Sequence, residues 1–315
     1  MATDYLLFVH GVNVRESPRN EQLRNYVYAD RLFALIAEKV QAQDPKRRLK
    51  KVPLYWGDVN RDSLSELRAS LQGASVWNNL WFRDFRQNQL IPFAGDAALY
   101  ISRHVGSLAV EQLAQQAIAG LQDYQPSDRL HLVTHSWGTV ILFDVLFANR
   151  WLQAEVPESG RRSVDLIRRA IFGLPPEQSA GICLGSIHTM GSPIALFSLI
   201  TITGQNHEEG SSHDLSSGFD GLLSHLERRL PWCNFIHPGD PVAWPLEKVI
   251  HQLIDHKSGV VMIEDVLTPG SGFLNLVGQL FQQSIVSIIN GGNAHSSYWQ
   301  SEKVAARISQ IILET

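Results

Sequence analysis

The sequence predicts an α/β fold built on a mostly parallel sheet of about six strands. Short apolar runs alternate along the chain with segments in which apolar residues recur at helical spacing. Such alternation is typical of strand–helix–strand units, whose crossover helices cover the faces of a parallel sheet. Because these strands are buried on both faces, we expect them to be apolar at nearly every position.

The first expected strand is Tyr5–Val9, which reads Y-L-L-F-V and ends in His10-Gly11. Its uninterrupted apolar character predicts a strand inside the sheet. The other expected strands, in chain order, are Leu49–Trp56, Arg129–Thr134, Leu184–Met190, Cys233–His237 and Gly259–Val266. Parallel sheets place their ligands at the carboxyl ends of the strands, so polar residues that follow these runs are candidates for chemistry.

The expected helices differ in their apolar faces. Gln22–Gln43 carries apolar residues on one side and is stopped by an Asp-Pro pair, which predicts an amphipathic helix. Trp137–Asn149 is apolar on all sides, as expected of a buried helix, whereas Glu302–Ile312 is amphipathic and closes the fold. We therefore expect a single domain spanning residues 1–315.

Two insertions interrupt the predicted alternation. Residues 59–125 are largely helical by pattern, which is more helix than one crossover needs, and this segment could cover a site as a lid. Within it, Trp77, Trp81 and Phe85 stand at i, i+4 spacing, the spacing of neighbours on one helix face. Residues 204–230 are polar at first, rich in Ser, Gly and His, and predict a loop.

Composition excludes several classes of protein. Apolar residues make up 44% and charged residues 18% of the chain, which argues against intrinsic disorder. The net charge of −4 gives no basic surplus for nucleic acid, and no apolar run is long enough to span a bilayer. Cys183 and Cys233 both lie in apolar stretches and predict two buried thiols in a reducing compartment. With no signal-peptide pattern at the start, we expect a cytoplasmic location.

The candidate nucleophile is Ser136. Leu130–Gly138 reads L-H-L-V-T-H-S-W-G, in which a strand enters x-x-Ser-x-Gly and then a helix. This pattern is typical of a nucleophile elbow, a tight turn that exposes a serine Oγ above the sheet, at a helix N-terminus that favours negative charge. Thr134 stands where the usual G-x-S-x-G pattern has its first glycine. The alternative interpretation is an ordinary helix N-cap serine.

A second segment supports this interpretation. Leu6–Gly11, L-L-F-V-H-G, resembles the strand that ends in His-Gly in α/β-hydrolases, especially lipases and esterases, and Thr189–Pro193, T-M-G-S-P, resembles a segment that follows a sheet strand in the same proteins. The resemblance implies an α/β-hydrolase fold, with an oxyanion hole formed by the backbone N–H groups of Val12 and Trp137. His10 is interpreted as a structural histidine that braces the loop.

The resemblance also implies the chain order serine, acid, histidine. Asp240 lies in Gly-Asp-Pro-Val, which resembles the acid-bearing turn of lipase-like hydrolases, and it is the candidate acid. Asp265 lies within the next expected strand and Asp220 in the polar insertion, so both are less well placed. The alternative for Asp240 is an Asx turn that caps its own loop.

The candidate base is His295. It lies after the last expected strand in Gly-Gly-Asn-Ala-His-Ser-Ser-Tyr-Trp, which resembles the histidine loop of the family. His251 and His256 precede that strand and would lie at its wrong end. A surface-loop histidine is the alternative interpretation.

These residues together predict a serine hydrolase that cleaves carboxylic esters through a Ser-His-Asp triad and an acyl-enzyme. Acyl lipids are suggested by the Trp- and Phe-rich segment Val76–Phe93, which could line an acyl pocket or form a lid; it could equally pack the insertion onto the domain. Transient contact of the protein with a membrane surface is compatible with such a substrate. The alternatives are an acyltransferase or thioesterase with the same triad, and a catalytically silent binding module.

No cofactor or metal is expected. The sequence has no phosphate-binding glycine motif and no His or Cys pattern with metal-ligand spacing. His207 and His213 lie among acidic residues of the polar insertion, where a solvated loop is favoured over a weak metal site. The expected partner is a small-molecule or lipid ester, with no nucleic acid and no transmembrane segment.

Overall fold

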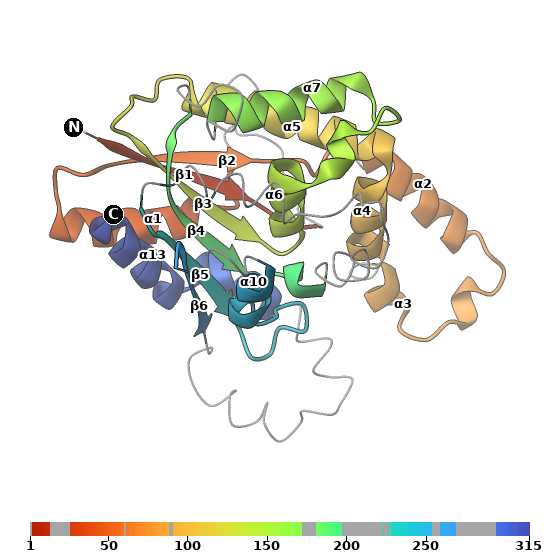
Figure 1. Ribbon diagram of the computed structural model, residues 1–315. Helices are drawn as coiled ribbons and strands as arrows, with labels where there is room; N and C mark the ends of the chain where they lie inside the picture. The colour runs from red at the N-terminus through yellow and green to blue at the C-terminus, as the bar shows by residue number, and fades with distance from the viewer. Residues whose placement is uncertain are drawn as a thin grey trace.

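The computed structural model describes residues 2–12, 26–59, 61–87, 91–171, 181–196, 223, 226, 228–253, 259–268 and 294–315. In this part of the chain six strands form one sheet in the order β2-β1-β3-β4-β5-β6, and each neighbouring pair is parallel. The strands are β1 (Thr3–Val9), β2 (Arg48–Leu54), β3 (Arg129–His135), β4 (Cys183–Met190), β5 (Leu230–Ile236) and β6 (Val261–Leu267). With helices on both faces, this sheet confirms the predicted α/β-hydrolase architecture (Figure 1).

The strand order reverses next to β1. The chain runs from β1 out to β2 at the sheet edge, then returns to β3 on the other side of β1. Val9 and Thr134 are paired at the carboxyl ends of β1 and β3, so the segments that follow both strands emerge side by side. Such a reversal opens a crevice above the strand ends, which is where ligands bind in open parallel sheets.

Successive residues of β1 point into two different layers. Leu6 and Phe8 pack with α1 (Asp30–Gln43) and α13 (Glu302–Glu314), whereas Leu7 and Val9 pack with α5 (Arg103–Leu121) and α6 (Trp137–Phe147). Figure 1 shows α1 beside α13 on one face of the sheet, and α5 beside α7 (Glu158–Leu166) on the other. The continuous apolar run of β1 is therefore explained by burial on both faces.

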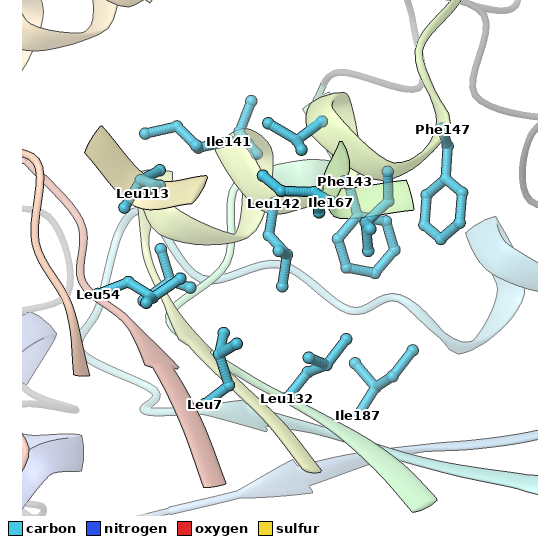
Figure 2. Close-up of a cluster of buried hydrophobic side chains, with 14 of the residues drawn as sticks. Leu7, Leu54, Leu113, Leu132, Ile141, Leu142, Phe143, Phe147, Ile167 and Ile187 are labelled. Atoms are coloured by element: carbon cyan, nitrogen blue, oxygen red, sulfur yellow. The ribbon is translucent and has the colours of Figure 1, made fainter. Parts of the chain in front are cut away.

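The helix that follows Ser136 is buried along its whole length. Every residue of α6 is buried, as its apolar sequence predicted. Figure 2 shows Ile141, Leu142 and Phe143 of this helix above strand residues such as Leu132 and Ile187. Since this helix cannot move without exposing the core, the turn at its start has a fixed support.

The first insertion contains several helices rather than one extended helix: α2 (Arg61–Gln72), η1 (Trp77–Asn79), α3 (Arg83–Phe85), α4 (Ile91–Ile101) and α5. The predicted i, i+4 face of Trp77, Trp81 and Phe85 is wrong, because this stretch is broken by turns. Trp77 is buried in a 3₁₀ turn, while Trp81 lies in the next turn with 80% of its surface exposed. In Figure 1, α2 and α3 lie beyond α4, on the side away from the sheet.

The insertion is attached to α6 through Tyr100, which contacts the buried ion pair of Asp144 with Arg150. The Tyr100 hydroxyl of α4 donates to Asp144 Oδ2 at 2.7 Å, and Arg150 Nε and Nη2 donate to the same carboxylate at 2.8 and 2.7 Å. The Arg150 guanidinium also lies over the Tyr100 ring, 5.1 Å from its centroid. On the outer side of α4, a Cβ at Gly95 would lie 2.3 Å from a methyl group of Leu64 in α2, so glycine permits this close packing.

The remaining described elements are η3 (Asn149–Leu152), a π-helical turn η4 (Ile167–Ile171), α10 (Glu247–Leu253) and η5 (Ser297–Gln300). Two expectations need correction. Cys233 is buried but Cys183 is exposed, because it is the first residue of its strand; neither forms a disulfide. The helix expected over Gln22–Gln43 begins only at Asp30 in the described residues. Among the helices described, none is both long and apolar enough to cross a membrane.

Candidate active site

The chain turns sharply at Ser136, between the end of β3 and the start of α6. Ser136 has φ 55° and ψ −130°, a conformation that residues other than glycine rarely adopt. Its N–H donates to the Met190 carbonyl at 2.9 Å, and its carbonyl accepts from the Thr139 N–H at 3.0 Å. Strained backbone persists only where its surroundings hold it, and it is concentrated at functional sites. A sharp, strained strand-to-helix turn of this kind is what the predicted nucleophile elbow requires.

The threonine that replaces the usual first glycine is accommodated by a hydroxyl pair. Thr134 Oγ1 and Thr139 Oγ1 lie 2.8 Å apart, and both residues are fully buried. The extra side chain therefore has a hydrogen-bond partner across the turn. This departure from the usual pattern leaves the sharp turn at Ser136 intact.

Two glycines bring the loop after β1 against this turn. A Cβ at Gly11 would lie 2.5 Å from Ser136 Cβ, and a Cβ at Gly138 would lie 2.4 Å from the His10 carbonyl oxygen. Neither distance leaves room for a side chain, so the close approach of the two segments requires glycine at both positions.

The two predicted oxyanion donors lie on the segments that these glycines bring together. Val12 follows Gly11, and Trp137 is the first residue of α6. N–H groups in the first turn of a helix point toward what precedes the helix, and the helix dipole favours negative charge there. Val12 and Trp137 therefore stand on the two segments that meet at Ser136, as the predicted oxyanion hole requires.

His10 braces the loop after β1, in agreement with its interpretation from the sequence. Its Nδ1 donates to the Gly11 carbonyl at 2.5 Å, and its Nε2 accepts from the Trp56 N–H at 3.3 Å. Trp56 Nε1 donates back to the His10 carbonyl at 3.1 Å, and the two rings are stacked. With both ring nitrogens engaged, this fully buried histidine is poorly suited to act as a base.

Asp240 and His295 form a hydrogen-bonded pair. His295 Nδ1 lies 2.8 Å from Asp240 Oδ2, which also accepts from the Tyr298 hydroxyl at 2.8 Å. Asp240 Oδ1 accepts from the Val242 N–H at 2.9 Å, so the Asx turn that was the alternative interpretation is present together with the pair. Burial alone would raise the pKa of Asp240, but the hydrogen bonds, that of His295 first, outweigh it and lower the pKa.

The serine and this pair are linked through His135, and no hydrogen bond joins Ser136 Oγ to His295 Nε2 directly. His295 Nε2 and Ser136 Oγ are both buried and have no hydrogen-bond partner in the described part of the chain. The neighbour of the serine, His135, contacts the His295 carbonyl oxygen through its Nε2 at 2.6 Å. Because the Asp240 carboxylate is hydrogen-bonded to His295 Nδ1, the ring nitrogen of His295 that remains for a reacting group is Nε2.

The glycine of the T-M-G-S-P segment, Gly191, packs against the Asp240–His295 pair. It has φ +56°, and a Cβ there would lie 2.7 Å from Asp240 Oδ2 and 3.1 Å from His295 Nδ1. A third contact would be Tyr298 Cε2 at 2.9 Å. Only glycine combines this backbone conformation with such close packing against the acid–base pair.

The other acids and histidines considered from the sequence either have a different set of contacts or lie outside the described residues. The Asp265 carboxylate accepts from Asn234 Nδ2 at 2.7 Å and from the Leu246 N–H at 2.9 Å, so it ties β5 and the following loop to β6. His251 lies on α10. Asp220 and His256 lie outside the described residues.

Two residues at this site were missed by the sequence reasoning. His135 packs against the His295 ring with centroids 4.5 Å apart, and Tyr298 holds Asp240. His135 was visible only as one letter of the serine motif, and Tyr298 only as part of an aromatic pair. Their contacts join positions far apart in the sequence, for which the chain carries no local signal.

No group of His, Cys, Asp and Glu side chains that could hold a metal occurs within the residues described. His207 and His213 lie outside them.

Comparisons with known proteins add little. No protein-family model matches the chain, and no curated protein sequence matches it significantly. A solved structure described as an iodinated complex of acetyl xylan esterase is similar over 98% of this chain and 97% of its own, with a TM-score of 0.29 and 10% identity. The fold assignment rests on the sheet topology rather than on this similarity.

Proposed function

We propose that the protein is a serine hydrolase that cleaves carboxylic esters, with Ser136 as nucleophile, His295 as base and Asp240 as acid. The observation that carries the proposal is the strained elbow beside the His295–Asp240 pair, with Ser136 Oγ and His295 Nε2 both buried and unpartnered among the described residues. Buried polar atoms without partners are costly, and catalysis gives a reason for keeping them.

In the first half of the reaction, His295 Nε2 takes the proton of Ser136 Oγ as that oxygen attacks the ester carbonyl carbon. Asp240 stabilises the resulting imidazolium through the hydrogen bond to Nδ1. The N–H groups of Val12 and Trp137 hold the tetrahedral oxyanion. The imidazolium then gives its proton to the leaving alcohol oxygen, and an acyl-serine remains.

In the second half, His295 takes a proton from a water molecule, which attacks the acyl-serine carbonyl. The tetrahedral intermediate uses the same two N–H donors, and the imidazolium returns the proton to Ser136 Oγ as the carboxylic acid leaves. An alcohol or thiol acceptor in place of water would give the acyl transfer that remains an alternative.

The direct test is intact mass after treatment with a fluorophosphonate probe. We expect one adduct on the wild-type protein and none on Ser136→Ala, because only an activated serine reacts rapidly. A folded wild-type protein that stays unmodified, with and without detergent, would refute the hydrolase and favour the silent binding module.

For the substrate class we propose acyl lipids presented at a membrane surface. Residues 61–86, which include α2 and α3, form what we call the α2–α3 arm, and residues 76–86 form its tip. The tip exposes Val76, Trp81 and Phe82, whose exposed fractions are 59%, 80% and 51%. Phe82 has a positive φ of 57°, rare for a bulky residue. Trp and Phe favour the membrane interface, where an aromatic ring is partly in contact with the acyl chains.

The charges around this tip suit anionic headgroups. Arg83 donates to Asn78 Oδ1 at 3.0 Å and Arg86 to the Trp81 carbonyl at 3.1 Å, so both guanidinium groups frame the aromatic tip; Asp84 is the acidic residue between them. A locally basic tip on a chain of net charge −4 is attracted to an anionic surface while the rest of the molecule is not.

Vesicle flotation tests the substrate class separately from the chemistry. We expect Trp81→Ala/Phe82→Ala to reduce binding to phosphatidylglycerol-containing vesicles and hydrolysis of a vesicle-borne ester, but not hydrolysis of a soluble short-chain ester. Leu152→Ala is the matched control, because Leu152 is 73% exposed elsewhere on the molecule. Equal losses on both substrates would contradict the lipid-surface proposal. Trp77 is unsuitable for this test, because it is buried.

A further inference from the structure

The residue that precedes the candidate nucleophile contacts the segment that carries the candidate base. His135 is the last residue of β3, and its Nε2 lies 2.6 Å from the backbone carbonyl oxygen of His295, 160 positions away in the chain. A carbonyl oxygen only accepts hydrogen bonds, so Nε2 carries the proton and donates it. His135 Nδ1 is then the unprotonated nitrogen, and in the described part of the chain it has no partner.

The ring of His135 is enclosed by this same segment. Its centroid lies 4.5 Å from that of His295, 5.8 Å from that of Tyr298 and 5.5 Å from that of Trp299. Only 6% of the residue is exposed. The contact is therefore packed as well as hydrogen-bonded, which fixes the segment in distance and in orientation.

Burial first, and then the neighbouring His295, lower the pKa of His135 to about 3. The ring is therefore neutral at the pH at which a histidine base works. This matters because a second imidazolium so close would oppose the positive charge that His295 acquires during the reaction. A neutral His135 ring can donate its hydrogen bond to the His295 segment without this charge repulsion.

The contact gives a short structural link between the proposed nucleophile and the proposed base. Ser136 is joined to His135 by one peptide bond, and His135 is joined to His295 by one hydrogen bond. The relative position of nucleophile and base therefore depends on one rigid strand end, not on the conformation of a long intervening chain. Fixed geometry between reacting groups is a large part of catalysis.

We propose that His135 is a positioning residue, which holds His295 at the distance and orientation that proton transfer from Ser136 requires. This role rests on the proposed hydrolase function. It predicts that an N–H donor is needed at position 135, and that bulk alone does not suffice.

The first test uses a spectroscopic signal that needs no substrate. We expect the His295 Nδ1 proton in the bond to Asp240 to give a far-downfield NMR resonance, which can be assigned by its absence in Asp240→Ala. We expect His135→Leu to lose or broaden this resonance, because the unanchored segment lets the proton exchange with water. We expect His135→Gln, whose amide keeps an N–H donor, to retain it.

The second test is kinetic, on a soluble short-chain ester. We expect His135→Leu to lower kcat by about 100-fold with little change in KM, the effect of an approximately 1 Å misplacement. His135→Gln should recover most of the loss. His188→Leu is the matched control, because His188 is also a fully buried imidazole on the sheet and has no place in the proposed chemistry. It should reduce the melting temperature while kcat stays near the wild-type value.

The outcomes separate this inference from the proposed function. If the wild-type protein hydrolyses no ester but the resonance responds to His135→Leu and not to His135→Gln, the positioning role of His135 is supported and the hydrolase proposal fails. If the wild-type protein hydrolyses the ester and neither the resonance nor kcat changes in His135→Leu, the positioning role of His135 is refuted. Equal effects of His135→Leu and His135→Gln would also overturn it.

Discussion

Replacing Gly191 with alanine should disable the site while leaving the fold in place. The new Cβ would lie 2.7 Å from Asp240 Oδ2, and ordinary contact begins near 3.4 Å, so the carboxylate has to retreat by about 0.7 Å. Displacements of this size in a catalytic group cost on the order of 10²-fold in rate, and we expect a loss of kcat of that order. The positive φ adds roughly 1–3 kcal/mol of backbone strain.

The assay compares kcat, KM and the rate of fluorophosphonate labelling, with thermal unfolding measured alongside. Gly239→Ala is the control, because a Cβ at Gly239, next to Asp240, meets nothing closer than 3.4 Å. We expect Gly239→Ala to retain nearly full activity. If Gly191→Ala keeps more than half of the wild-type kcat, or if both variants lose the same amount, the inferred packing of Gly191 against the acid–base pair is incorrect.

Three further predictions concern contacts within the protein. Tyr298→Phe removes a hydrogen bond to the acid, and we expect kcat to fall several-fold with a loss of about 1 kcal/mol of stability, measured by urea unfolding. Arg150→Met leaves the buried Asp144 carboxylate unpaired, and we expect about 3–5 kcal/mol of destabilisation by the same method. Burial lowers the pKa of His131 and of His188, so the unfolded chain binds more protons below about pH 6.5. The melting temperature should therefore fall from pH 7 to pH 5, and less steeply in His188→Gln; an unchanged slope would contradict this.

The strands were the easiest part of the fold to predict. Tyr5–Val9 is apolar at every position because both faces of β1 are covered. Burial on both faces requires apolar residues at successive positions, and such a run can be recognised in the local sequence. α6 was predictable for the same reason, since all of its residues are buried. The boundaries were less accurate: β5 begins at Leu230 rather than Cys233, because Leu230, Pro231 and Trp232 also pair with β6.

The aromatic segment of the insertion shows where a pattern misleads. An i, i+4 spacing is informative only if the chain is helical throughout, and here η1 ends at Asn79 and Phe82 adopts a left-handed conformation. Asn78-Asn79 has low helix propensity, which was a weak local warning. Trp77 and Trp81 therefore have opposite environments, one buried and one exposed.

The proposed triad was named from the order of its residues and from resemblance, whereas its supports come from tertiary contacts. Ser136, Asp240 and His295 each lie in a segment with a local pattern. The contacts of His135 with His295 and of Gly191 with Asp240 join distant segments, and no periodicity or turn signal encodes them. Those supports became visible only once the strands were placed side by side.

The hydrogen bond of Tyr100 in α4 to Asp144 in α6 has a consequence for how the molecule would approach a lipid layer. The α2–α3 arm packs on α4 through Leu64, α4 contacts Asp144 of α6 and Arg150 through Tyr100, and α6 begins directly after Ser136. A continuous series of contacts therefore links the exposed aromatic tip to the helix that follows Ser136. Anchoring the tip in a bilayer would set the tilt of the whole sheet, and with it the height and angle at which the serine meets an ester bond.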